Sequence, residues 1–234
     1  IKSTNRVLIS SKNALQTAGN AIIFGGVIVY PTDTLYGFGV DARNETAIKR
    51  LNAIKGRTGP MSVIAPDVNT VLNWTNISYQ DWELVKKFLS GPTTIILPVK
   101  KGIVHSSILG KDGTLGIRIP SHSFGPELTS KLGFPITTTS VNKTYENPLN
   151  NPKDIIHKFD GEFDLLIDDG NLPKTKGSTI YKLEKSNDIE SLEEFEITSS
   201  DVKNENLSEV KEDLPEQTLG KLSISSLEEQ EIIN

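Results

Sequence analysis

Two cations, Lys55 and Arg57, stand two residues apart at the end of a predicted helix. Asn44 can cap the start of that helix, and apolar residues recur along it at steps of three and four. Basic side chains near a helix C terminus interact favourably with the helix dipole, which is a sufficient structural reason for both cations. They can also bind a phosphate or another anion, provided that polar groups from other segments converge on the same place.

A row of polar side chains belongs to a strand predicted at residues 136–140. Its alternate positions place Thr138, Ser140 and Asn142 on one face. A hydroxyl and an amide after a strand often cap the next turn, and this is the structural alternative. If the two cations lie beside this face, the same groups complete an anion site.

Arg118 lies in an apolar strand predicted at residues 116–119. A buried guanidinium needs a carboxylate or a phosphate as its partner. Either a structural ion pair or a substrate anion can supply that partner, and the sequence leaves both open.

The elements that must position these residues alternate between strands and helices. A short buried strand at residues 27–30, a polar loop, the helix that ends at Lys55 and a strand at residues 62–65 form a predicted strand–helix–strand unit. The loop carries the hydroxyl and carboxylate groups of Thr32, Asp33, Thr34 and Tyr36, and its glycines Gly37 and Gly39 allow a close approach of the backbone. Further helices are predicted at residues 13–24, 79–89, 125–132 and 152–159, and further strands at 93–99, 165–167 and 179–183. This alternation predicts an α/β fold.

Charge divides the chain into a basic body and an acidic tail. Residues 184–234 hold 15 acidic and 4 basic residues, a net charge of -11. Because the whole chain carries -5, residues 1–183 carry +6, from 21 basic and 15 acidic residues. A basic body suits phosphate-bearing ligands. We therefore predict a catalytic domain at residues 1–186 and an acidic linker or tail at 187–234. The tail is either partly disordered or acts as a lid. Short helices are candidates within it at 189–196 and 205–212.

Composition excludes several classes of site and of protein. The chain has no cysteine, which excludes disulfides, thiolate metal sites and a cysteine nucleophile. The histidines have no metal-like spacing, and neither GxxxxGK[ST] nor GxGxxG occurs. No apolar run is long enough to span a membrane. The sequence starts at Ile1 and shows no signal-peptide pattern, and one interpretation of this start is that the first residues have been trimmed. We expect a soluble, cytoplasmic protein with no membrane contact.

Six short motifs occur along the chain: YPTDTLYG at 30–37, KGR at 55–57, SGPTTIIL at 90–97, GIRIP at 116–120, TTSVN at 138–142 and GSTIY at 177–181. In their order and spacing they resemble the YrdC-like family of threonylcarbamoyl-adenylate synthases. The resemblance implies a twisted mixed sheet of parallel and antiparallel strands with flanking helices and a concave, positively charged face. It also implies that L-threonine, bicarbonate and ATP give L-threonylcarbamoyl-AMP and pyrophosphate, and that a separate transferase delivers the group to tRNA as threonylcarbamoyladenosine.

The same resemblance assigns roles to residues of this chain. The residues that it implies for catalysis and ATP binding are Lys55, Arg57, Ser140 and Asn142, and those for L-threonine are Thr32, Tyr36, Arg118, Thr138 and Ser178. Mg²⁺ is expected to be held through the ATP phosphates, with no direct protein ligand.

The chain departs from the family pattern mildly at Thr138 and Val141 and more clearly in three other places. The loop after Arg57 is short, Tyr145 stands where glycine is common, and no arginine–glycine pair follows Tyr181. Two alternatives therefore accompany the synthase: the carbamoyl-adenylate domain of hydrogenase maturation proteins, whose cysteine-rich zinc motifs are missing here, and a catalytically weakened RNA-binding module.

Overall fold

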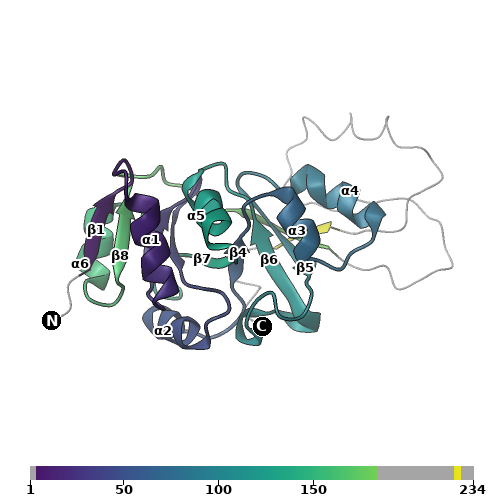
Figure 1. The fold of residues 1–234 in the computed structure, drawn as a ribbon, viewed down its shortest axis with the longest axis horizontal. Coiled ribbons are helices and arrows are strands. Elements are labelled where there is room, and N and C mark those ends of the chain that lie inside the picture. Colours follow the sequence, from purple (N-terminus) through teal and green to yellow (C-terminus); the bar gives the residue numbers. More distant parts are fainter. Residues whose placement is uncertain (1–3, 184–223, 228–234) are drawn as a thin grey trace.

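The computed structural model describes residues 4–183 and 224–227, which form one mixed sheet with helices packed against it (Figure 1). Its strand order is β1-β8-β2-β3-β7-β4-β6-β5-β9-β10. The strands are β1 Asn5–Leu8, β2 Ile28–Pro31, β3 Tyr36–Gly39, β4 Ser62–Ile64, β5 Thr93–Pro98, β6 Thr114–Arg118, β7 Ile136–Ser140, β8 Leu165–Asp168, β9 Thr179–Leu183 and β10 Ile224–Leu227. The pairs β1–β8, β2–β8, β4–β6 and β5–β9 are parallel and the others are antiparallel. The predicted mixed sheet with flanking helices is confirmed, and the charged concave face stays a prediction.

The helices cover both faces of the sheet. They are α1 Ala14–Ile23, α2 Glu45–Lys55, α3 Val68–Trp74, α4 Tyr79–Phe88, α5 Phe124–Leu132 and α6 Pro152–Phe159, with short 3₁₀ turns at Ser106–Ile108 and Lys111–Gly113. Successive residues of a strand point to opposite faces, and Val29 and Tyr30 accordingly enter two different hydrophobic clusters. The cluster of Tyr30 contains residues of α1 and α5, which lie side by side in Figure 1. The cluster of Val29 contains residues of α2, α4 and α6.

Residues 36–39 form a strand, whereas the sequence indicated a loop after β2. β3 pairs antiparallel with β2, with Val29 opposite Phe38, and also with β7. Its glycines are explained by packing, because a Cβ built on Gly39 would lie 2.6 Å from Cε1 of Tyr30. The close approach that the sequence predicted here is thus made by the Tyr30 ring.

The strand–helix–strand unit uses β3, rather than β2, as its first strand. β3 and β4 are both antiparallel to β7, which lies between them, so α2 connects two parallel strands across β7. Asn44 caps α2 as predicted, accepting a hydrogen bond from Ala47 N at 3.1 Å, and Gly56 ends it with a φ of 70°. This topology brings the C-terminal end of α2 to the C-terminal end of β7.

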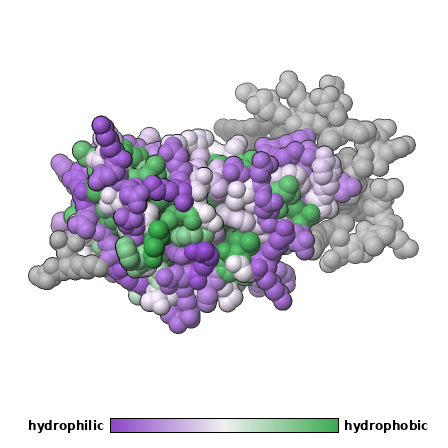
Figure 2. Space-filling model, viewed as in Figure 1, coloured by the Kyte–Doolittle hydropathy of each residue, from purple (hydrophilic) through white to green (hydrophobic). Residues whose placement is uncertain are grey.

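The tail prediction falls mostly outside the described residues, as do the helices expected at 189–196 and 205–212. Residues 224–227 are described, and β10 pairs antiparallel with β9, with Ile224 opposite Leu183. Among the described residues, no helix is both long and apolar enough to cross a membrane. The face in Figure 2 is mainly hydrophilic, with smaller hydrophobic areas between.

Candidate functional site

Lys55, Ser140 and Asn142 are in direct contact where α2 and β7 end. The Lys55 side chain is 3% exposed, and Nζ donates to the carbonyl oxygen of Ser140 at 2.6 Å and to Oδ1 of Asn142 at 3.2 Å. The Ser140 hydroxyl donates to the same Oδ1 at 2.6 Å. The ammonium group, the hydroxyl and the amide oxygen therefore form one compact cluster, although 85 residues separate Lys55 from Ser140.

The turn after β7 is fastened to the same cluster. Nδ2 of Asn142 donates to the carbonyl oxygens of Lys143 and Glu146, at 3.0 and 2.7 Å. The backbone N–H and the hydroxyl of Thr144 both donate to the carbonyl oxygen of Lys55, at 3.0 and 3.1 Å. The amide of Asn142 is therefore fixed in one orientation, with its oxygen toward Lys55 and Ser140 and its nitrogen toward the turn.

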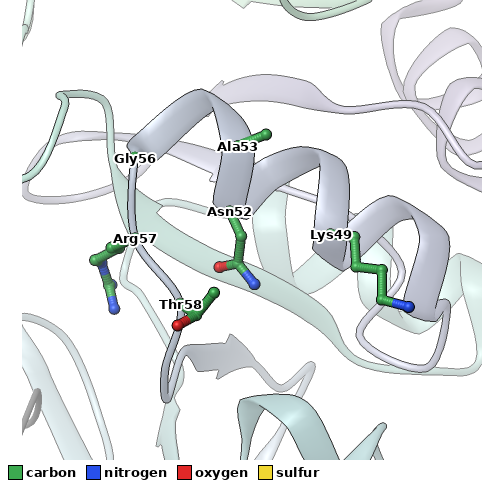
Figure 3. Close-up of a pocket in the computed structure, with 6 residues that line it drawn as sticks. All are labelled: Lys49, Asn52, Ala53, Gly56, Arg57 and Thr58. Carbon is green, nitrogen blue, oxygen red and sulfur yellow. The ribbon is translucent and has the colours of Figure 1, made fainter.

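Arg57 is not one of the residues that these hydrogen bonds join. It follows the left-handed Gly56 and lines an open pocket of about 470 Å³ (Figure 3). The pocket lining consists of Lys49, Asn52, Ala53, Gly56, Arg57 and Thr58. In Figure 3 the side chains of Lys49 and Asn52 leave the same side of α2, and Arg57 and Thr58 follow in the loop. Nη1 of Arg57 donates to the carbonyl oxygen of Pro60 at 3.4 Å, which holds the short loop across the end of the helix.

Arg118 forms an ion pair within the protein. Its side chain is buried on β6, where Nη2 pairs with Oδ1 of Asp33 and Nη1 donates to the Thr34 hydroxyl at 3.2 Å. The second carboxylate oxygen of Asp33 accepts a hydrogen bond from Ser121 N at 2.8 Å. Of the two partners that the sequence left open for Arg118, the structure contains the structural carboxylate.

The Thr32 hydroxyl is turned inward on its own loop. It donates to the carbonyl oxygen of Leu35 at 2.7 Å and accepts from the backbone N–H groups of Thr34 and Leu35, each at 3.2 Å. The hydroxyls of Thr32 and Thr34 lie 3.1 Å apart. Thr32, Thr34 and Arg118 are thus linked in one buried network.

Tyr36 and Ser178 connect the remaining loops. The Tyr36 hydroxyl donates to the carbonyl oxygen of Gly170 at 2.8 Å and accepts from Asp169 N at 2.9 Å. Burial raises the pKa of Tyr36 to about 12. The hydroxyl of Ser178 lies 2.7 Å from that of Thr94 on β5. These contacts hold the segment between β8 and β9 against β3 and β5.

Thr138 lies on β7, two residues before Ser140, so both side chains belong to the same face of the strand. A Cβ built on Gly37 would lie 3.2 Å from the Thr138 hydroxyl. The glycine of β3 therefore leaves room for this side chain, which is buried. The preceding residue on β7, Thr137, accepts a hydrogen bond from the Tyr30 hydroxyl of β2 through its carbonyl oxygen.

Several residues of these networks were given no specific site role from the sequence, although Asp33 and Thr34 were noted as polar groups of their loop. Asp33 and Thr34 sit inside the YPTDTLYG segment, so their position beside Thr32 was the available signal. Thr94 and Asp169 carried no comparable signal, because their contacts join segments far apart in the chain. In the described residues, no group of three or more His, Asp or Glu side chains is arranged to hold a metal ion.

Known proteins resemble both the sequence and the fold. The family Sua5/YciO/YrdC, described as telomere recombination, matches residues 20–194. A protein of Methanocaldococcus jannaschii, provisionally named threonylcarbamoyl-AMP synthase, is 34% identical over 175 residues, or 74% of this chain and 82% of its own length. The threonylcarbamoyl-AMP synthase of Idiomarina loihiensis is 32% identical over 157 residues, or 65% of this chain and 84% of its own length.

Among solved structures, that of P. abyssi Sua5 complexed with L-threonine is similar with a TM-score of 0.66 and 26% sequence identity. The match covers 76% of this chain and 54% of that protein, so the chain spans about half the length of this Sua5. The family match covers residues 20–194, and both relatives are more than 30% identical over more than four fifths of their own length. The chain therefore belongs to the Sua5/YciO/YrdC family.

Proposed function

We propose that this protein is an L-threonylcarbamoyladenylate synthase, an enzyme of the nucleotidyltransferase type. It would convert L-threonine, bicarbonate and ATP into L-threonylcarbamoyl-AMP, pyrophosphate and water. The observation that carries the proposal is the contact of Lys55 with Ser140 and Asn142, in a chain whose relatives bear the name of this synthase. A tRNA threonylcarbamoyl transferase would then use the product.

The chemistry asks the protein mainly for positioning and for positive charge. The amine of threonine takes up bicarbonate to form a carbamate, with loss of water. A carbamate oxygen then attacks the α-phosphorus of ATP, and the bond to the β-phosphate oxygen breaks as pyrophosphate leaves. Negative charge grows on the phosphate oxygens during this step, and a fixed cation in a buried site stabilises it strongly.

Lys55 and Arg57 would act on the triphosphate. Lys55 is held by two acceptors at the end of α2, which fixes its charge next to Ser140 and Asn142. To bind phosphate oxygens, the Ser140 hydroxyl would turn away from Oδ1 of Asn142, and Nδ2 of Asn142 would exchange its contact with the carbonyl oxygen of Lys143. Arg57 would reach the phosphates from the edge of the pocket. Mg²⁺ would be held through the ATP phosphates, with no direct protein ligand, and would supply positive charge that offsets the charge of the phosphates.

The amino-acid side of the site would be built around Thr32, Tyr36, Arg118, Thr138 and Ser178. Their contacts constrain the proposal, because Asp33 already neutralises part of the charge of Arg118. A threonine carboxylate would therefore share Arg118 with Asp33 rather than meet an isolated cation. The buried hydroxyl of Thr32 would act by shaping the turn that faces the substrate.

The test is pyrophosphate release by the full chain, measured with ATP and Mg²⁺ and with L-threonine, L-serine or no amino acid, each with and without bicarbonate. We expect release that needs both threonine and bicarbonate. Serine lacks one methyl group and should be used less well by about 10- to 100-fold, since a buried methyl group discriminates by roughly 1–3 kcal/mol. Release that does not depend on threonine or on bicarbonate would overturn the proposal.

The RNA-binding alternative is favoured only by the positive charge of residues 1–183. It predicts RNA binding that weakens steeply as salt increases, together with no threonine-dependent consumption of ATP.

The cytoplasmic location stays a prediction from composition, and a role of the acidic tail as a lid stays a proposal. If proteolysis of the tail proceeds equally fast with and without ATP and threonine, the proposal that the tail acts as a lid is wrong.

A further inference from the structure

Tyr145 has an unusual backbone conformation. Its φ is 67°, and Asp112 is the other non-glycine residue with a positive φ in the described part of the chain. Aspartate is tolerated there because its side chain is short and polar, whereas a bulky residue is a genuine outlier. The Tyr145 side chain is 88% exposed, so packing within the protein does little to offset this strain. A strained conformation that persists without packing is a reason to look for a ligand contact.

The neighbours of Tyr145 fasten it to the proposed nucleotide site. On one side, Thr144 donates two hydrogen bonds to the carbonyl oxygen of Lys55. On the other side, the carbonyl oxygen of Glu146 accepts from Nδ2 of Asn142, and its carboxylate pairs with Lys158 of α6. Tyr145 therefore forms the tip of a turn that is clamped at both ends. Its backbone is held one residue away from groups that bond to Lys55 and Asn142.

We propose that the Tyr145 ring stacks on the adenine of bound ATP, an inference that rests on the ATP site proposed above. If the phosphates lie at Lys55, Ser140 and Asn142, the nucleobase must lie farther out, at the rim of the site. Tyr145 presents an exposed aromatic ring at that rim on a turn that is already ordered. Stacking of a base on an aromatic ring needs no hydrogen-bond pattern, so Tyr145 would supply affinity for the nucleotide rather than a choice of base.

Three variants of the full chain separate the ring from the backbone. Tyr145→Asn removes the ring but keeps a residue that tolerates positive φ, and Tyr145→Phe keeps the ring. Tyr79→Asn is the matched control, because Tyr79 is 75% exposed at the start of α4, a helix that lies well apart from α2 in Figure 1. For each protein the dissociation constants of ATP with Mg²⁺ and of tripolyphosphate, which has no base, are measured by calorimetry.

We expect Tyr145→Asn to weaken ATP binding about tenfold, the usual scale for one base–aromatic contact, and to leave tripolyphosphate binding unchanged. Tyr145→Phe and Tyr79→Asn should bind both ligands as the wild type does. Equal weakening for both ligands would mean that Tyr145 only shapes the turn, and it would overturn the inference, as would normal ATP binding by Tyr145→Asn.

This experiment also separates the inference from the proposed function. If the wild type shows the Tyr145-dependent binding of ATP but releases no pyrophosphate with threonine, the synthase proposal fails and the stacking role stands. If it releases pyrophosphate while Tyr145→Asn binds ATP normally, the synthase stands and the stacking role falls. A wild type that binds no ATP overturns both.

Discussion

The ammonium nitrogen of Lys55 lies 2.6 Å from the carbonyl oxygen of Ser140, and this joins the last residue of α2 to the last residue of β7. The hydrogen bond is charge-assisted and partly buried, so Lys55 has a structural role beside its proposed catalytic one. Loss of activity after its removal is therefore not enough to assign the catalytic role, and stability must be measured on the same variant.

We predict that Lys55→Met lowers the free energy of unfolding by about 1–3 kcal/mol, because the partly buried acceptor on Ser140 and the buried acceptor on Asn142 lose their donor. It should also lower kcat for pyrophosphate release by at least about tenfold. Urea denaturation and initial rates measure the two effects. In a double-mutant cycle with Asn142→Ala the stability losses should not add, and strict additivity would contradict the contact.

Arg57 offers a cleaner test of catalysis, because its side chain lies at an open pocket rather than in the core. We predict that Arg57→Ala lowers turnover on the order of ten- to a hundredfold, the scale of one charge-assisted hydrogen bond of roughly 1.5–3 kcal/mol. The fold should remain intact by circular dichroism.

Lys49→Ala is the matched control for Arg57→Ala. Lys49 lines the same pocket, but its side chain is 72% exposed and pairs with Glu45 on the surface of α2. An exposed pair of this kind contributes little to stability, and we expect near-normal turnover. Unchanged pyrophosphate release in Arg57→Ala would remove Arg57 from the mechanism, and equal losses in both variants would indicate a general effect of charge.

Much of the fold was predictable because local signals agreed with the tertiary structure. α2 begins at its Asn44 cap and stops at Gly56, and α4 begins after Ser78, whose hydroxyl accepts from Asp81 N. β3 was missed because its two glycines are typical of a loop, and only pairing with β2 and β7 makes it a strand. The seven-residue α3 was missed because its apolar pattern is too short to be distinctive.

The site was predictable to a similar degree. The contact of Lys55 with Ser140 and Asn142 agrees with the expectation drawn from motif order. The pairing of Arg118 with Asp33 was not predicted, because it joins residues 85 apart and nothing local in the sequence selects that carboxylate. Long-range partners of buried charges depend on strand order, and strand order was the part of the fold that the sequence specified least.

Breaking the Asp33–Arg118 pair should destabilise the fold strongly, because both side chains are largely buried. We predict that Asp33→Asn lowers the free energy of unfolding by about 3–5 kcal/mol, since it leaves the Arg118 charge without its carboxylate. The asparagine oxygen can still accept from Ser121 N, so the loss reports on the charge. Urea denaturation measures it.

The double variant Asp33→Asn with Arg118→Met serves as the control for this pair. It removes both charges, and it should recover part of the stability that Asp33→Asn loses. A single Asp33→Asn variant that unfolds within about 1 kcal/mol of the wild type would show that the pair is not a structural requirement.

Gly39 should not tolerate a side chain. A Cβ at this position would lie 2.6 Å from Cε1 of Tyr30, whose ring is buried and whose hydroxyl donates to the carbonyl oxygen of Thr137 at 3.0 Å. Because that hydrogen bond restrains the ring, we predict that Gly39→Ala destabilises the protein by about 1–3 kcal/mol. Thermal unfolding measures the change.

Gly19→Ala provides the opposite result. Gly19 lies within α1, and its nearest new contacts would be 3.8 Å away on Leu132 and 3.9 Å away on Leu128. Alanine should fit there and stabilise the helix by roughly 0.5–1 kcal/mol. A neutral Gly39→Ala variant would mean that the Tyr30 ring can move, contrary to the packing described above.

Tyr36 should make the fold sensitive to alkali. Burial raises its pKa to about 12 from the ordinary value of 10.0, so the folded state keeps the phenol proton over a range in which the unfolded chain loses it. The contribution of Tyr36 to stability is complete below pH 10, and it is lost progressively as the pH rises from 10 to about 12. Burial also raises the pKa of Tyr30, which adds to this sensitivity.

We predict that the free energy of unfolding falls less steeply with pH in Tyr36→Phe than in the wild type over this window. The difference in slope should correspond to about one proton, and the contribution of Tyr30 should remain. Urea denaturation of the wild type and of Tyr36→Phe at a series of pH values from about 9 to about 12 gives the two slopes of stability against pH. Identical slopes would contradict the burial of an ionisable phenol at Tyr36.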